Sequence, residues 1–224
     1  MYKGHRITLV IPCLNEENGI RAVLDATPDF VDETIVVDNN STDGTERVAR
    51  SMGAVVIRET ARGYGRAYRK GFAHATGDII VTLDGDHSYP VDALSYLLEA
   101  FFHAGVGFLS ASRFPMMNRN AMPWKNRLGN RILSITMSIL FLRWVSDSQS
   151  GMWVFRKLAL DKMKLRSDGM TFSEEIKIEA IRRRDIGFRE IPISYSQRVG
   201  EIKLQPWRDG IRNLLFLFRK RLSF

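Results

Sequence analysis

The stretch "IIVTLDGDHSYP" (residues 79–90) runs from a short apolar segment into two aspartates that are separated by one glycine. The apolar segment has the composition of a buried β-strand, and a carboxylate at the end of such a strand costs free energy unless a positive group meets it. Asp84 and Asp86 offer two hard oxygen ligands of the kind that Mg²⁺ or Mn²⁺ uses together with substrate phosphates. The alternative is a turn in which the pair caps the helix that begins near Pro90.

Segments with strand and helix patterns alternate on both sides of this stretch. We expect strands over residues 6–12, 32–38, 54–59, 78–84 and 106–113, with amphipathic helices between them. Short, wholly apolar strands between amphipathic helices are typical of an α/β fold whose mostly parallel sheet has helices on both faces.

Polar residues follow four of these expected strands. Pro12–Glu16 come after the first strand, Asp38 ends the second, Asp84 and Asp86 follow the fourth, and Arg113 follows the fifth. Ligands of parallel sheets bind at the carboxyl ends of the strands. We therefore expect these residues to meet in one site.

Basic residues and a glycine-bearing segment accompany the carboxylates. The segment "RGYGRAYRKG" carries Arg62, Arg66, Arg69 and Lys70, and arginines beside a metal suit a diphosphate. We expect Arg66 to contact such a ligand. The segment has no GK[ST], and no GxGxxG stands where a dinucleotide-binding fold needs it, which disfavours a P-loop nucleotide or a nicotinamide cofactor.

The composition limits the cellular compartments and the classes of partner that fit the chain. The chain has 224 residues, a net charge of +8 and a single cysteine, Cys13, which excludes an intrachain disulfide and favours a reducing, cytoplasmic setting. A basic balance suggests an anionic partner, but no nucleic-acid recognition motif is present. The longest weakly polar or apolar run, residues 132–142, is shorter than the roughly 20 residues that span a bilayer.

Two helices expected in the second half combine arginines with apolar faces. On the first, at about residues 126–145, Arg127, Arg131, Ser134 and Ser138 form one stripe and the other faces are apolar. The terminal helix, residues 207–224, repeats this pattern, which suits a helix that lies on a membrane surface. The alternative is a core helix with basic residues in solvent.

The segments "VIPCLNEE", "VVDNNSTDGT", "RGYGRAYRKGF", "ATGDIIVTLDGD", "SASRF", "DSQSGMWVFRK" and "RVGEIKL" occur in an order that resembles glycosyltransferase family 2. The likeness covers roughly residues 6–204 and is nearest to the dolichyl- or polyprenyl-phosphate hexose synthases. It implies a GT-A (Rossmann-like) fold, Mg²⁺ or Mn²⁺ as cofactor, and inverting transfer of a hexose from a nucleoside-diphosphate sugar to a lipid phosphate on the cytoplasmic face of a membrane.

The resemblance also implies roles for individual residues. Asp84, Asp86, Arg113 and Asp147 would be catalytic, with Asp147 orienting rather than taking a proton. The acceptor phosphate would meet Arg113, Arg127 and Arg131, and the metal would meet Asp84, Asp86 and Ser88. The nucleotide sugar would be bound by Pro12, Leu14, Glu16, Val36, Asp38, Arg66, Asp84, Gly85, Asp86, Arg198 and Lys203. The chain departs from the family pattern at Leu14, often Tyr; at Ser88, Gln in some members; and at Ile202, usually Ser.

We expect one GT-A domain over residues 1–206, which includes the helix at about 126–145, followed by the amphipathic helix 207–224. A membrane-protein partner or a homo-oligomer is compatible with this organisation. Two alternatives stay open, namely a family 2 transferase with a soluble sugar or polysaccharide acceptor, and a non-catalytic nucleotide-binding module. GDP-mannose, UDP-glucose and UDP-N-acetylglucosamine all stay open as donors. For Glu174 and Glu175, a solvated helix face is the alternative to a place in the site.

Overall fold

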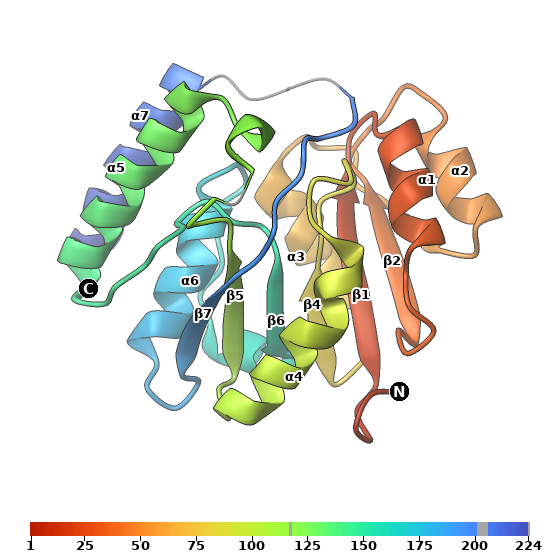
Figure 1. Cartoon of the computed structure of the whole chain (residues 1–224), viewed down its shortest axis with the longest axis horizontal. Coiled ribbons are helices and arrows are strands. Elements are labelled where there is room, and N and C mark those ends of the chain that lie inside the picture. Colours follow the sequence, from red (N-terminus) through yellow and green to blue (C-terminus); the bar gives the residue numbers. More distant parts are fainter. Residues whose placement is uncertain (117, 201–205, 224) are drawn as a thin grey trace.

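A computed structural model of the chain describes residues 1–116, 118–200 and 206–223. It contains a seven-stranded sheet in the order β3-β2-β1-β4-β6-β5-β7, in which every neighbouring pair is parallel except those that include β6 (Figure 1). The predicted mostly parallel α/β sheet is therefore confirmed. The strands are β1 Ile7–Cys13, β2 Glu33–Asp38, β3 Val55–Arg58, β4 Ile79–Thr82, β5 Phe108–Ser112, β6 Trp153–Arg156 and β7 Phe188–Pro192.

Helices cover both faces of the sheet, as predicted, because successive strand side chains point to opposite sides. Leu9 and Val36 pack against the layer of α1, α2 and α4, whereas their neighbours Val10 and Val37 pack against the layer of α3, α5, α6 and α7. The helices are α1 Glu17–Asp25, α2 Thr45–Ser51, α3 Tyr64–His74, α4 Leu94–Ala104, α5 Trp124–Phe141, α6 Phe172–Arg182 and α7 Pro206–Leu222.

The antiparallel strand β6 decides which residues reach the functional edge of the sheet. It lies between β4 and β5 and runs opposite to both. The segment that precedes β6, residues 146–152, therefore starts at the edge where the parallel strands end. Asp147 reaches the same edge as Asp84 and Arg113, although it precedes a strand and they follow one.

The helices α5 and α7 lie side by side (Figure 1). Both leave apolar side chains on the surface. The expected end of the first helix at residue 145 is wrong, because Leu142 adopts a left-handed backbone conformation (φ 52°) that stops α5 at Phe141. Residues at helical spacing on α5 and its end are between 44 and 87% exposed and form what we call the α5 stripe: Trp124, Leu128, Ile132, Ile135, Ile139 and Leu142. The α7 stripe consists of Ile211, Leu215, Phe218 and Leu222. No helix among the described residues is both long and apolar enough to cross a membrane.

Candidate active site

The carboxylates of Asp84 and Asp86 are each held by protein donors on one oxygen. Oδ1 of Asp84 accepts a hydrogen bond from Tyr64 Oη at 2.9 Å and lies 3.4 Å from Tyr68 Oη. Oδ1 of Asp86 accepts from the backbone N–H of Ser88 at 3.0 Å and from its hydroxyl. The Ser88 hydroxyl thus positions Asp86, and its service as a metal ligand stays a prediction.

Close approach of two strand ends explains the glycine between the aspartates. A Cβ at Gly85 would lie 2.4 Å from Cys13 Sγ, at the end of β1. A side chain would therefore push the turn away from β1. Cys13 is buried in this contact.

Electrostatics at this turn favour the arrival of a positive charge. Loss of hydration, together with the negative charge of Asp86, raises the pKa of Asp84 to about 7, although Arg113 and Arg198 act in the opposite direction. A cation bound between the two carboxylates would remove this penalty. The contact of Gly85 with Cys13 brings the residues predicted after the first and fourth strands to one edge.

Arg198 joins the carboxylate pair to the loop after β1. Its Nη2 lies 2.8 Å from Glu16 Oε1 and 3.5 Å from Asp86 Oδ2. The N–H of Val199 donates to the Asp86 carbonyl at 2.8 Å. The segment with Arg198 and Val199 therefore lies along the turn that contains Asp84, Gly85 and Asp86, which we call the aspartate turn. The structure thus brings together three of the residues predicted to bind the donor. Lys203 lies outside the described residues.

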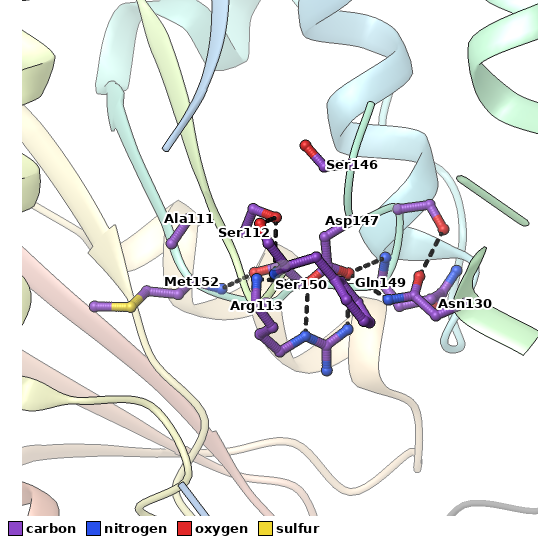
Figure 2. A network of polar contacts seen from close by, with 12 residues as sticks. Ala111, Ser112, Arg113, Asn130, Ser146, Asp147, Gln149, Ser150 and Met152 are labelled. Carbon is purple, nitrogen blue, oxygen red and sulfur yellow. Dashed lines mark hydrogen bonds and ion pairs between the residues drawn. The ribbon is translucent and has the colours of Figure 1, made fainter. Parts of the chain in front are cut away.

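A second charged cluster surrounds Asp147, which is fully buried (Figure 2). Its carboxylate accepts from the N–H, Nε and Nη2 of Arg113 at 3.0, 2.7 and 2.8 Å, from Asn130 Nδ2 at 2.7 Å and from the Gln149 N–H at 3.2 Å. Burial opposes ionisation, but the charge and hydrogen bonds of Arg113 outweigh it and hold the pKa of Asp147 well below its ordinary value. Asp147 is therefore a fixed counter-ion for Arg113.

Two of the three guanidinium nitrogens of Arg113 are bound to Asp147. In the described part of the chain, Nε and Nη2 pair with Asp147, and no hydrogen bond uses Nη1. The guanidinium lies 5.2 Å from the ring centre of Tyr195, whose ring is 5.2 Å from that of Tyr89. The segment that carries Tyr195 also contacts the turn after Asp86, because the Ser196 N–H donates to the Ser88 carbonyl at 3.0 Å.

Several of these partners were missed in the sequence. Tyr64 and Tyr68 stand one helical turn apart in "RGYGRAYRKG", and this spacing, which places both on one helix face, is the signal that could have found them. Asn130 and Lys177 have no local signal, and neither has Glu190, whose carboxylate accepts from the backbone N–H groups of Ser146 at 2.6 Å and Asp147 at 3.3 Å. Lys177 is fully buried and its Nζ donates to the Asp147 carbonyl at 2.6 Å.

The other residues predicted to bind the nucleotide sugar lie in varied surroundings. Arg66 pairs with Asp168 at 2.6 Å on the loop before α6 and does not contact the aspartate pair. Val36 is fully buried in the core and supports Asp38 from within the sheet. Asp38 is buried and its Oδ1 accepts from the Ser41 N–H at 3.2 Å. Pro12 and Leu14 are half-buried in and after β1.

On the acceptor side, α5 faces the Asp147 cluster with a polar surface. Asn130 and Ser134 are buried and hydrogen-bonded to this cluster, so the predicted stripe turns its serines inward. Arg127 is half-buried and Arg131 exposed, on either side of Asn130.

The two glutamates at the start of α6 are buried, so a solvated helix face is wrong for both. Glu175 accepts from the N–H groups of Arg166 and Ser167 and pairs with Lys220 of α7 at 3.2 Å. Glu174 accepts from Gln149 Nε2 at 2.8 Å, and burial raises its pKa well above the ordinary value.

Comparison with known proteins agrees with this geometry. The family described as Glycosyl transferase family 2 matches residues 8–164. The chain belongs to glycosyl transferase family 2. Within this family it is 32% identical to the dolichyl-phosphate hexose transferase of Haloferax volcanii over 212 residues, which cover 93% of this chain and 91% of that protein.

A longer relative shows similar identity. The chain is 32% identical over 218 residues to the low-salt glycan biosynthesis hexosyltransferase Agl6 of Haloferax volcanii, covering 94% of this chain and 52% of that protein. This chain therefore spans about half of that relative's length.

Solved structures show the same fold. Glucosyl-3-phosphoglycerate synthase from Mycobacterium tuberculosis, in complex with Mn²⁺, uridine diphosphate and phosphoglyceric acid, matches with a TM-score of 0.76 at 23% identity. The match covers 97% of this chain and 78% of that chain. The family 2 chain therefore has the predicted GT-A-like fold.

Proposed function

We propose that this glycosyltransferase moves a hexose from a nucleoside-diphosphate sugar to a polyprenyl (dolichyl) phosphate at a membrane surface, with inversion. The observation that carries the lipid acceptor is the exposed α5 stripe, because the opposite face of the same helix holds Asp147 through Asn130. A lipid chain on the outer face of α5 would thus be close to the acceptor arginine. Similarity to a dolichyl-phosphate hexose transferase supports the same acceptor class.

The carboxylate oxygens of the aspartate turn fit a divalent ion as ligands. Asp84 and Asp86 each have one oxygen held by the protein, and the other oxygen of Asp86 already lies near the guanidinium of Arg198. These two carboxylates would hold Mg²⁺ or Mn²⁺ together with the donor diphosphate. The bound ion would neutralise charge that develops on the leaving diphosphate. Arg198 would then pair with the diphosphate, and Asp38 and the loop after β1 would contact the nucleoside.

The acceptor needs orientation more than a base. A phosphate monoester has a second pKa near 6, so its oxygen is already anionic at neutral pH. Asp147 accepts five hydrogen bonds and would keep Arg113 in place instead of taking a proton. Arg113 would bind the acceptor phosphate through Nη1, and Arg127 and Arg131 would guide it along α5.

Surface charge supports a peripheral position on the cytoplasmic face of an anionic membrane. The α5 and α7 stripes are bordered by exposed arginines, among them Arg131, Arg143, Arg212 and Arg219. Each basic residue near such a leaflet contributes about 1 kcal/mol of attraction. A soluble acceptor, as in glucosyl-3-phosphoglycerate synthase, would not require these apolar surfaces.

A donor and acceptor screen tests the proposal. GDP-mannose, UDP-glucose and UDP-N-acetylglucosamine would each be offered with polyprenyl phosphate in anionic vesicles and, separately, with 3-phosphoglycerate. We expect lipid-linked product from one donor, and its loss in EDTA. Product formed only on the water-soluble acceptor would support the soluble-acceptor transferase, and no turnover of any donor would support a binding module.

Charge reversal on α5 tests the acceptor side. Arg127→Glu with Arg131→Glu should raise the KM for polyprenyl phosphate about tenfold, the effect of one 1.4 kcal/mol contact, and leave the KM for the donor nearly unchanged. The matched control is Arg184→Glu with Arg189→Glu, exposed arginines near the start of β7 at the opposite edge of the sheet. Equal loss of donor and acceptor affinity in the α5 variant would contradict the lipid-surface assignment.

A further inference from the structure

The two oxygens of the Asp84 carboxylate have different surroundings. Tyr64 donates to Oδ1, and Tyr68 is the next nearest hydroxyl to the same oxygen. Both tyrosines belong to α3 and lie one turn apart, with ring centres separated by 4.8 Å in an edge-on arrangement. Within the described part of the chain no group donates to Oδ2. The helix therefore holds one oxygen and leaves the other to a ligand.

Gly151 makes room for this contact. A Cβ at this position would lie 2.2 Å from Tyr64 Oη and 3.2 Å from Asp84 Oδ1. The Gly151 backbone is fixed on both sides, because its carbonyl accepts from Thr82 Oγ1 at 2.7 Å and its N–H donates to Tyr89 Oη at 2.8 Å. The hydroxyl of Tyr64 thus occupies a place that three separate elements of the fold keep open.

The Asp86 carboxylate is also held on one oxygen, but its hydrogen-bond donor is Ser88 instead of a tyrosine. Ser88 holds Oδ1 of Asp86 through its N–H and hydroxyl, and Oδ2 points toward Arg198, 3.5 Å away. Ser88 is only two residues from Asp86, so its contact belongs to the turn itself. Tyr64 is 20 residues from Asp84 and reaches the turn after β4 from helix α3.

We propose that Tyr64 is a positioning residue that fixes Oδ1 of Asp84 and so turns Oδ2 toward the divalent ion of the donor site. This inference rests on the metal-dependent function proposed above. Groups that hydrogen-bond a metal ligand orient it and typically change metal affinity 10- to 100-fold when they are removed. Tyr68 would support Tyr64 by packing, because its own proton is shared between Asp84 and the Gly151 carbonyl at 3.4 and 3.3 Å.

The test is Mn²⁺ binding to Tyr64→Phe in the presence of UDP or GDP, measured by electron paramagnetic resonance and calorimetry without a sugar donor. The substitution removes one oxygen and keeps the ring. We expect Mn²⁺ affinity to fall about tenfold or more, with unchanged Tm and unchanged nucleotide affinity in EDTA. Tyr2→Phe is the matched control, since Tyr2 donates to the Glu99 carboxylate at 2.6 Å far from this site.

A second variant displaces the same hydroxyl without removing it. Gly151→Ala keeps the tyrosine but forces its hydroxyl away, and it should lose Mn²⁺ affinity in the same way. Wild-type Mn²⁺ affinity in Tyr64→Phe would overturn the positioning role alone. Absence of Mn²⁺ binding by the unaltered protein with either nucleotide would instead overturn the metal-dependent function.

Discussion

Asp84 and Asp147 lie at the same edge of the sheet and differ in the positive charge that the protein supplies to each. Asp147 receives three hydrogen bonds from Arg113 and two from other groups, and its pKa is held well below the ordinary value. Asp84 receives one good hydrogen bond from a neutral tyrosine, and its pKa rises to about 7. The protein thus pairs Asp147 with its own cation, whereas no described residue forms an ion pair with Asp84.

The comparison separates anchoring from ligand binding. A carboxylate with an internal counter-ion stabilises the fold, and its removal leaves a buried charge without a partner. A carboxylate without one is a cost to the fold that a bound ion repays. Substitution of Asp84 should therefore lower turnover without lowering stability, whereas substitution of Asp147 should lower stability.

The largest expected effect is on turnover, at the aspartate turn. Asp84→Asn and Asp86→Asn should each lower kcat about a thousandfold, the scale for loss of a main electrostatic partner, because the divalent ion loses a charged ligand. The free energy of unfolding of Asp84→Asn should stay equal or rise, since the amide needs no counter-ion. Steady-state kinetics and urea denaturation measure the two quantities.

Asp161→Asn, an exposed aspartate distant from the turn, is the matched control. Full activity of either turn variant, or activity of the wild type in EDTA, would contradict the proposal that Asp84 and Asp86 hold a divalent ion needed for turnover.

The next effect is on stability, at the buried pair. Asp147→Asn should lower the free energy of unfolding by about 3–5 kcal/mol, because Arg113 is left buried without its counter-ion. Arg113→Gln should do the same for Asp147. The double variant should lose less than the sum of the two, as expected for partners in one network. Additive losses in urea denaturation would show that the two side chains act independently.

The smallest expected effect concerns a third carboxyl group, that of Glu174, which forms no ion pair with any described residue. Burial raises its pKa, so the folded protein binds this proton more tightly than the unfolded chain does. The stability that the group contributes is then complete below the ordinary range of a glutamate and is lost as pH rises toward the folded-state pKa. Glu174→Gln, which keeps an acceptor for Gln149, should be less stable relative to wild type at pH 5 than at pH 8.

Thermal unfolding at several pH values measures this difference, with Glu46→Gln as control, a partly exposed glutamate that pairs with Arg50. Parallel pH profiles for Glu174→Gln and wild type would show that Glu174 is ionised in the folded protein.

The sequence was sufficient for the features that depend on local periodicity. Alternating strand and helix patterns predicted the mostly parallel sheet with helices on both faces, and the polar residues after four strands predicted a common site edge. The aspartate turn and Arg113 could be selected because the carboxyl ends of parallel strands meet at one edge, whereas Arg198 was implied by the resemblance to family 2. The resemblance to family 2 was visible in the same segments.

Only the tertiary structure decided the pairings across long stretches of chain. Arg113 meets Asp147 because β6 runs antiparallel, and Arg198 reaches Glu16 across 182 residues of sequence. Burial of Glu174 and exposure of the α5 stripe depend on which face of each helix meets the sheet. Periodicity identifies an apolar face, but it does not say what covers that face or which distant charge arrives beside a carboxylate, because those contacts form between segments whose relative position is set by the whole fold.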